Sequence, residues 1–278
     1  MTVALSLLSA FFAGTSDFIG GLGSRKAPAL SVTTLSHAVG FVVAVVIGFA
    51  AGGDPTSSDL GWGALAGIGG AVGLLSLYQG FAKSRVSIVA PVAGVGAAAI
   101  PVLWDRLNGA SLASGSVVGI GLGLVAIALI SMERSESRGS LRRGLLFGAG
   151  GAAGLGTMFV FFGQTGEDSG IWPLVPARAT GFVLLATVML VTGVSARTAR
   201  PARLEVIGAG VAGTIANGLF IAATQVGSLA TAAVITSMFP AATVLWARVV
   251  FKENLRRVQI LGLVMALVAV ALIAGSST

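Results

Sequence analysis

Three ionisable side chains within apolar stretches carry the chemistry that this sequence offers: Asp17, His37 and Arg178. Asp17 lies in the apolar run 2–23, and His37, the only histidine of the chain, lies in the run 29–51. A charged group is costly in an apolar environment, so such groups are rare unless they have a partner or a function. These three residues are therefore the first candidates for binding or proton transfer.

Asp17 and His37 are expected at similar depths on adjacent antiparallel helices. Asp17 precedes Arg25 by eight residues, about 12 Å along a helix axis, and His37 follows Pro28, a suitable helix start, by nine. An Asp–His pair can bind and release a proton, because its surroundings shift the pKa of both groups. We hypothesise that Asp17 couples substrate movement to protons and that His37 tunes it. The alternative for both residues is a structural role, with the polar atoms satisfied by their neighbours.

Arg178 follows the acids Glu167 and Asp168 by about ten residues. It can bind an anionic group of a substrate or pair with these two acids, and the sequence leaves both alternatives open. Polar residues that suit the lining of a substrate cavity also lie within apolar runs: Tyr78, Gln79 and Asn217.

Three prolines within apolar runs are candidates for gating kinks, because each interrupts helical hydrogen bonding: Pro91, Pro101 and Pro240. A purely structural kink is the alternative for each of them.

The composition indicates a membrane protein. The 278 residues are 55% apolar and only 10% charged, whereas soluble domains carry about 25% charge, and the mean hydropathy is +0.96. A helix spans a bilayer with about 20 apolar residues. Ten runs approach that length: 2–23, 29–51, 61–82, 86–104, 113–131, 143–164, 171–194, 205–225, 230–250 and 258–275. The first run has no basic segment before it, so we expect a retained helix rather than a signal peptide.

Several classes of protein are disfavoured by what the chain lacks. It has no cysteine, one histidine and a single embedded acid, which argues against an intramembrane enzyme, a metal site or a bound cofactor. The net charge of +7 resides in short gaps between apolar runs, so membrane topology explains it better than nucleic-acid binding does. We expect no catalytic residues, and we expect the bilayer and a small-molecule substrate as partners.

The charges of the gaps predict the orientation. Basic residues gather in the odd-numbered gaps, with Arg106 as an exception, and the even-numbered gaps carry acids: Asp54, Asp59, Glu167 and Asp168. Cytoplasmic loops are enriched in lysine and arginine. The odd-numbered gaps are therefore expected to face the cytoplasm, which places both termini outside a multi-pass protein of the cytoplasmic membrane.

Short phrases return at a constant offset. "HAVGFVV" at 37–43 returns as "RATGFVL" at 178–184, and "VLWDR" at 102–106 returns as "VLWAR" at 244–248. "VAIALI" and "GT" recur likewise, and all four offsets lie between 141 and 143 residues. The pattern predicts two copies of a five-helix unit, residues 1–137 and 138–278.

Five helices per copy require the second copy to enter the membrane from the opposite side. Equivalent gaps have exchanged charge sign: "GSRKAP" corresponds to "GEDSGIWP", and "GGDPTSSD" corresponds to "SARTARPAR". Inverted repeats are typical of secondary transporters, in which the substrate site lies between the repeats near the midplane. The sequence thus predicts an all-α polytopic protein of about ten helices that transports by alternating access. A passive facilitator or channel without ion coupling is the alternative.

Resemblance to a known family is strongest in residues 228–273, which read "SLATAAVITSMFPAATVLWARVVFKENLRRVQILGLVMALVAVALI". This stretch resembles the end of an EamA-domain protein of the drug/metabolite transporter superfamily. The likeness rests on small residues and a proline in the ninth run, then Glu253, then Gln259 and Gly262. A fainter copy occupies the first half. The resemblance implies ten helices, a central cavity between the halves, and export or exchange of small metabolites or drugs.

The chain departs from the family pattern in three respects. "AGT" stands where a tryptophan-glycine is common in the first helix, and Lys252 stands where a glycine precedes the glutamate. Well-known members place both termini in the cytoplasm, which is opposite to the orientation that the charges predict here.

Small residues recur at four-residue spacing in two of the runs: Gly115, Gly119 and Gly123, then Gly144, Gly148, Ala152 and Gly156. Such faces permit close helix contact, either within the chain or in a homodimer.

Overall fold

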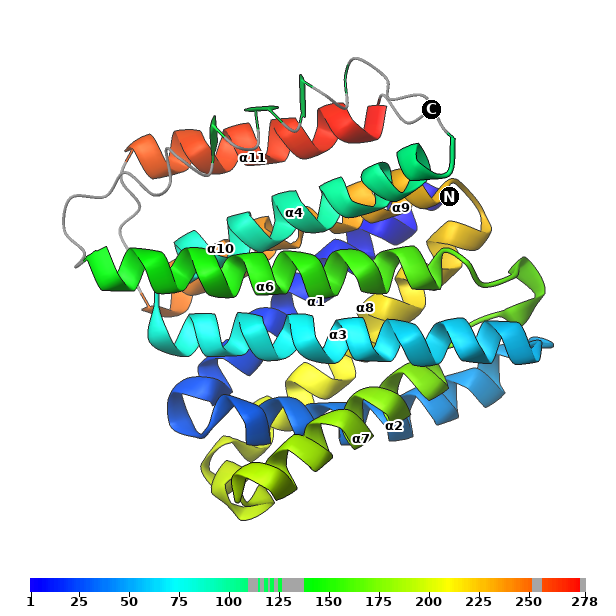
Figure 1. The fold of residues 1–278 in the computed structure, drawn as a ribbon, viewed down its shortest axis with the longest axis horizontal. Helices are drawn as coiled ribbons and strands as arrows, with labels where there is room; N and C mark the ends of the chain where they lie inside the picture. Colours follow the sequence, from blue (N-terminus) through cyan, green and yellow to red (C-terminus); the bar gives the residue numbers. More distant parts are fainter. Residues whose placement is uncertain are drawn as a thin grey trace.

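The computed structural model describes residues 1–109, 138–251 and 257–275, together with residues 115, 118, 119, 121, 122, 125 and 126. These residues form a bundle of helices joined by short loops (Figure 1). The helices are α1 (Thr2–Lys26), α2 (Ala29–Ala51), α3 (Ser57–Lys83), α4 (Val86–Leu107), α6 (Arg138–Phe162), α7 (Leu174–Thr192), α8 (Arg203–Gln225), α9 (Leu229–Thr236), α10 (Phe239–Phe251) and α11 (Arg257–Gly275). Two short 3-10 segments, η1 (Glu167–Ser169) and η2 (Ala196–Ala202), precede α7 and α8.

Eight segments of the described chain are long and apolar enough to cross a membrane. They are Thr2–Lys26, Ala29–Ala51, Ser57–Lys83, Val86–Trp104, Leu141–Phe162, Leu174–Thr192, Ala196–Gln225 and Leu229–Val250. The predicted all-helical membrane fold is confirmed to this extent. The expected run 113–131 lies largely outside the described residues, and the run 258–275 coincides with α11.

The ninth expected span is divided into two helices. α9 ends and α10 begins around residues 237–238, just before Pro240. A proline has no N–H, and its ring clashes with the carbonyl group four residues earlier, here that of Thr236. The helical ladder therefore stops at this point and restarts. Pro91 and Pro101, in contrast, lie within the continuous helix α4.

Apolar residues, among them Phe81 and Phe220, form most of the interior of the bundle, and small hydroxyl side chains are buried among them. Large apolar side chains also cover the outside. The hydroxyls of Ser9 and Ser16 in α1 each donate a hydrogen bond of 2.8 Å to a backbone carbonyl of α8, those of Ala216 and Ala209 respectively. Outward side chains such as Phe49 are exposed. This distribution suits a lipid bilayer, where the apolar surface faces the acyl chains and polar atoms form hydrogen bonds within the protein.

Glycines bring several helices into backbone contact. A side chain on Gly154 of α6 would lie 2.5 Å from the Cα of Gly73 in α3, and one on Gly67 of α3 would lie 2.8 Å from the carbonyl carbon of Ala177 in α7. The small-residue face of α6 packs on α4, where Gly148 meets Val92. That face of α6 is thus used within the chain.

Several helix contacts in the described part of the bundle occur in corresponding pairs, although the packing of α1 on α3 has no comparable contact between α6 and α8. α3 packs on α6 as α1 packs on α8, α4 packs on α6 as α9 and α10 pack on α1, and α3 packs on α7 as α2 packs on α8. In these pairs of contacts α1 corresponds to α6, α2 to α7, α3 to α8, and α4 to the α9–α10 pair. Helices paired in this way run in opposite directions along the bundle (Figure 1).

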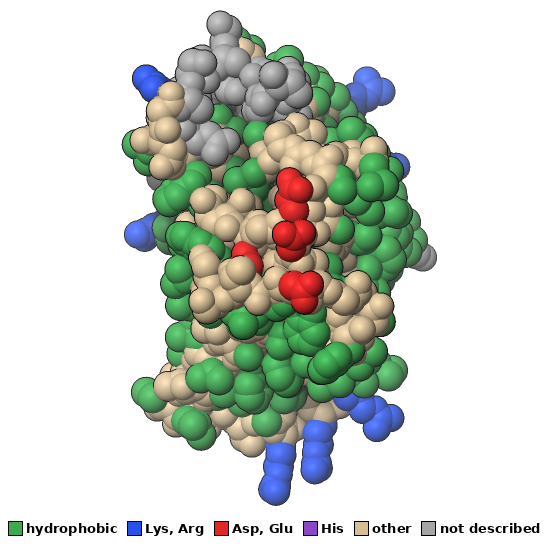
Figure 2. All heavy atoms as spheres, turned by 90° about the vertical axis from the view of Figure 1, so that its right-hand side faces the viewer, with side chains coloured by type: hydrophobic (Ala, Val, Ile, Leu, Met, Phe, Trp, Pro, Cys, Tyr) green, Lys and Arg blue, Asp and Glu red, His purple; other side chains and the backbone are tan. Residues whose placement is uncertain are grey.

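Most acidic and basic residues lie at opposite ends of the bundle, with Glu205 and Arg106 as exceptions. The loops that precede α3 and α7, together with the first turn of α3, carry acids, which gather on the end shown in Figure 2. The backbone N–H of Asp54 donates to the carbonyl of Asp168 at 2.8 Å, and the Asp59 carboxylate accepts from Gly166 N–H at 2.7 Å. α1 begins and α11 ends at this end (Figure 1). The other end carries the basic residues Arg25, Lys26, Lys83, Arg85, Arg142, Arg143, Arg197, Arg200, Arg203, Arg248 and Arg257.

Candidate functional site

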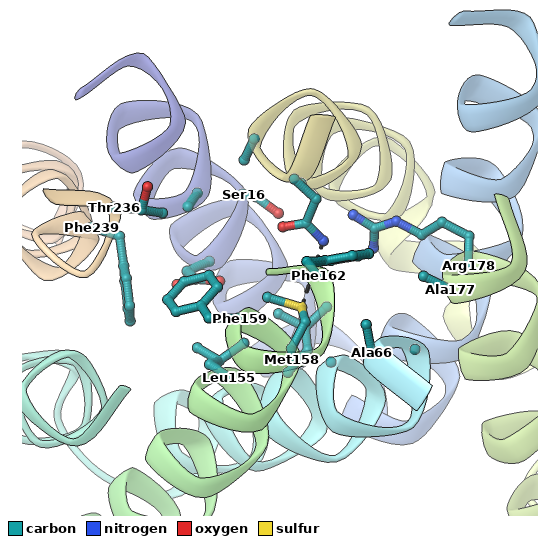
Figure 3. A pocket seen from close by; sticks show the side chains of 18 of the residues that line it. Ser16, Ala66, Leu155, Met158, Phe159, Phe162, Ala177, Arg178, Thr236 and Phe239 are labelled. Carbon is teal, nitrogen blue, oxygen red and sulfur yellow. Dashed lines mark hydrogen bonds between the residues drawn. The ribbon is translucent and has the colours of Figure 1, made fainter. Parts of the chain in front are cut away.

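A cavity of about 60 Å³ lies inside the bundle, lined by α1, α2, α3, α6, α7, α8, α9 and α10 (Figure 3). Four of the residues that the sequence singled out line it: Asp17, His37, Arg178 and Asn217. Both halves of the chain contribute to its walls. Such a volume has room for only a few water molecules.

Asp17 projects from the middle of α1, 15 residues after Thr2 and nine before Lys26. Its side chain is only 5% exposed. The Tyr78 hydroxyl donates a hydrogen bond of 3.4 Å to the backbone carbonyl of Ser16, beside Asp17. Within the described part of the chain, neither a hydrogen bond nor an ion pair reaches the Asp17 carboxylate. A carboxyl group in this position is free to interact with whatever enters the cavity.

His37 lies eight residues after the start of α2, so its depth from the basic end matches that of Asp17. Its Nδ1–H donates a hydrogen bond of 3.0 Å to the carbonyl of Thr33. The other ring nitrogen, Nε2, faces Gly181 of α7. Among the described residues, no hydrogen bond joins His37 to Asp17. The structure thus brings the two groups to one cavity without a direct contact between them.

The recurring phrases "HAVGFVV" and "RATGFVL" face each other across the α2–α7 contact. The His37 side chain occupies the space left by Gly181, where a Cβ would lie 2.8 Å from Nε2. The Arg178 side chain and the Thr214 hydroxyl share the space left by Gly40, where a Cβ would lie 2.6 Å from Thr214 Oγ1 and 3.1 Å from Arg178 Cδ. Each phrase therefore supplies one polar side chain and the glycine that accommodates the other.

Arg178 is 6% exposed and lies in the second turn of α7. Figure 3 shows its guanidinium reaching from α7 toward Phe162. Its Nε and Nη2 atoms are buried and have no hydrogen-bond partner among the described residues. Glu167 and Asp168 are exposed at the end of the bundle, and neither forms an ion pair with Arg178 in the described chain. Of the two alternatives for Arg178, pairing with these acids is therefore not observed.

An apolar wall completes the cavity. Met158, Phe159 and Phe162 of α6 lie between Arg178 on one side and Phe239 on the other (Figure 3). The amide of Asn217 donates to the sulfur of Met158 at 3.7 Å. The cavity therefore has a polar, charged side and an apolar side.

The comparisons with known proteins agree with this architecture. No curated protein sequence matches the chain. A crystal structure of another protein aligns with 96% of this chain and 95% of its own, at 18% sequence identity and a TM-score of 0.66, which shows a shared fold. Residues 142–275 match the EamA-like transporter family. The second half of the chain is an EamA-like domain. Members of this family are membrane transporters of the drug/metabolite type, and the resemblance found in residues 228–273 is confirmed.

Other candidates in this EamA protein lie outside the cavity lining formed by the described residues. Tyr78 is fully buried between α3 and α1 and fills the space left by Gly20. Gln79 is half-buried on α3. Pro240 packs on α4, where a Cβ at Gly94 would lie 2.5 Å from its ring.

Sequence reasoning missed most of the apolar wall and one polar group. Phe159, Phe162 and Phe239 are apolar residues within apolar runs, so nothing in their spacing separates them from lipid-facing positions. Thr236 also lines the cavity, and its buried hydroxyl has no partner among the described residues. Its place four residues before Pro240 is the one signal that pointed to it, because a proline there frees the helix end.

Proposed function

We propose that this EamA-domain protein is a secondary transporter, and an exporter, that moves a small metabolite by alternating access. In this proposal residues 1–137 and 138–278 are two inverted five-helix repeats, which makes ten transmembrane helices in all. Three features support the repeats: equivalent helices run in opposite directions, their packing partners correspond, and His37 and Arg178 occupy equivalent positions against Gly181 and Gly40.

The single observation that carries the proposal is the cavity. It lies between the halves, both halves line it, and it holds the three embedded ionisable groups Asp17, His37 and Arg178. Substrate sites of inverted-repeat transporters lie in this position. At about 60 Å³ the cavity is too small for most metabolites, so a substrate enters only when one half moves relative to the other. Export is the direction that the family resemblance favours.

The charge distribution supports an orientation with the basic end in the cytoplasm. Both termini then lie outside the cytoplasmic membrane.

Proton coupling through Asp17 completes the mechanism. An embedded carboxyl group that has no protein partner can take up a proton on one side and release it on the other as its surroundings change between the two conformations. His37 lies in the same cavity beside Arg178. A protonated His37 would repel the guanidinium of Arg178. His37 therefore tunes, with pH, the balance between the inward-open and outward-open conformations.

The test is untargeted metabolite profiling of the medium around cells that overproduce the protein. Wild type, an empty vector, Asp17→Asn and Asp54→Asn are compared at two pH values. Asp54 is an exposed acid, so Asp54→Asn controls for the loss of a carboxylate. We expect metabolites that wild type and Asp54→Asn enrich, and we expect Asp17→Asn to lose the enrichment or its dependence on pH.

An unchanged pH dependence in Asp17→Asn would rule out coupling through this residue. A second assay separates a carrier from a passive facilitator. Proteoliposomes loaded with the enriched metabolite should take up its labelled form against a gradient by counterflow, which a channel cannot support. Absence of counterflow would contradict alternating access.

A further inference from the structure

Arg178 is a buried cation with unused hydrogen-bond donors. Its side chain is 94% buried, and Nε and Nη2 have no partner among the described residues. Among the described residues no ion pair reaches Arg178, whereas Lys26 pairs with Glu205 at the basic end of the bundle. A buried charge without a partner is strongly unfavourable. The position is therefore explained best by a partner that comes from outside the chain.

Neutral groups and one titratable ring surround the guanidinium on the elements packed against it. From α2 come Gly40 and His37, and from α8 come Gly213 and the hydroxyl of Thr214, which donates to the carbonyl of Gly210. The phenol of Tyr78 in α3 is neutral at physiological pH. In the part of the chain that the structure describes, the acid that shares the cavity with Arg178 is Asp17, and the two are not joined.

The geometry points to a small carboxylate with an apolar body as the transported substrate, held through its carboxylate by Arg178. Nε and Nη2 lie on one edge of the guanidinium, and their two parallel N–H groups match the two oxygens of a carboxylate. The wall of Met158, Phe159 and Phe162 leads from Arg178 to Phe239 on the opposite side (Figure 3). An apolar body can pack along this wall while the carboxylate meets the guanidinium.

This inference rests on the proposed function and adds a reason for proton coupling. A carboxylate that enters the cavity meets Arg178 and also Asp17. An ionised Asp17 repels the substrate and a protonated one does not, so binding of the anion and binding of a proton at Asp17 favour each other. The substrate and the proton then occupy the cavity together and cross in the same direction, so the outward gradient of the substrate drives export.

The test measures the binding of small carboxylates, separately from their transport, on the purified full-length protein in detergent. The probes are two matched pairs, 3-phenylpropionate with 3-phenylpropionamide and butyrate with butyramide. We expect at least one acid to raise the melting temperature at millimolar concentration, and neither amide to do so. Ligand that binds only the folded state raises the melting temperature in this way.

Variants of Arg178 locate the effect. Arg178→Gln should abolish the shift with the acids, Arg178→Lys should retain part of it, and the exposed Arg197→Gln should retain all of it. Without a probe, Arg178→Gln should melt at or above the temperature of wild type, because the variant no longer buries an unpaired charge. If Arg178 instead had a structural partner, the variant without a probe would melt lower.

Four outcomes would overturn the inference. They are equal shifts with acids and amides, no shift with any acid, a shift that survives in Arg178→Gln, and stabilisation by phenyl phosphate but by neither carboxylate. The proposed function is judged separately, by counterflow. Carboxylate binding that depends on Arg178 in a protein without counterflow would support this site and contradict the carrier. Counterflow of an uncharged metabolite would support the carrier and contradict the carboxylate site.

Discussion

Substitution of Gly181 by alanine should destabilise the protein through the His37 ring. The new Cβ would meet two ring atoms of His37, Cδ2 most closely and Nε2 at 2.8 Å, well inside the 3.4 Å at which ordinary van der Waals contact begins. The imidazole is fully enclosed and held by its bond to Thr33, so it cannot swing away without loss of that bond. Overpacking of this kind costs about 1–3 kcal/mol.

The assay is thermal unfolding of the purified protein in detergent. A loss of about 1–3 kcal/mol corresponds to a fall of about 2–12 °C in the melting temperature for a chain of this size. Gly61→Ala is the matched control, because nothing lies within 4 Å of a Cβ at Gly61 in α3. This control should be neutral or mildly stabilising, since alanine favours the helix over glycine.

A double substitution identifies the cause. His37→Ala removes the ring that the new methyl group meets, so the double variant Gly181→Ala/His37→Ala should melt higher than Gly181→Ala alone. Contacting residues show such coupling, whereas distant ones add independently. The reasoning is refuted if Gly181→Ala is as stable as Gly61→Ala, or if removal of the ring brings no recovery.

Three further predictions concern the ends and the packing of the bundle. Single cysteines in this cysteine-free chain should report its orientation in the membrane. Ser57→Cys should react with an impermeant maleimide added outside intact cells, and Ala196→Cys should not. The reverse pattern would show that the basic end faces outward. Asp59→Asn should lower stability by about 0.5–2 kcal/mol in thermal unfolding, because this carboxylate accepts hydrogen bonds from the N-cap residue Thr56, in a capping box, and from Gly166 of the neighbouring loop. The exposed Asp54→Asn should not lower it, and equal effects would contradict the role of Asp59 in the capping box. Gly67→Leu should separate α3 from α7, so that size-exclusion chromatography shows aggregated protein; a monodisperse peak would argue against the backbone contact.

The sequence predicted the parts of this molecule that depend on local chemistry. Apolar runs with short charged gaps locate the spans, because each span must satisfy its own backbone in lipid. Asp17, His37 and Arg178 were found for the same reason, since a charge in such a run is conspicuous. The equivalence of His37 and Arg178 followed from the constant offset of the two phrases.

Other features depend on how helices meet, and the spacing of residues does not encode this. Phe159 and Phe162 resemble any lipid-facing aromatic residue until α6 is placed against α3 and α4, where both rings meet Phe220 of α8. The lack of a partner for Arg178 emerges only when every neighbouring helix is in position. The proximity of Asp17 and His37 suggested a pair, whereas Thr33 accepts the hydrogen bond from His37 instead.

The crossed arrangement of His37 with Gly181 and Arg178 with Gly40 has a consequence for inheritance. Gly181 cannot acquire a side chain while the His37 ring stays in place, and Gly40 cannot do so while Thr214 and Arg178 keep their size. A mutation at one of these glycines is therefore tolerated only together with a change more than a hundred residues away, in the other half of the chain. We expect homologues to vary at these positions in concert: a bulkier residue at 181 should accompany a smaller one at 37, and a bulkier residue at 40 should accompany smaller ones at 214 and 178.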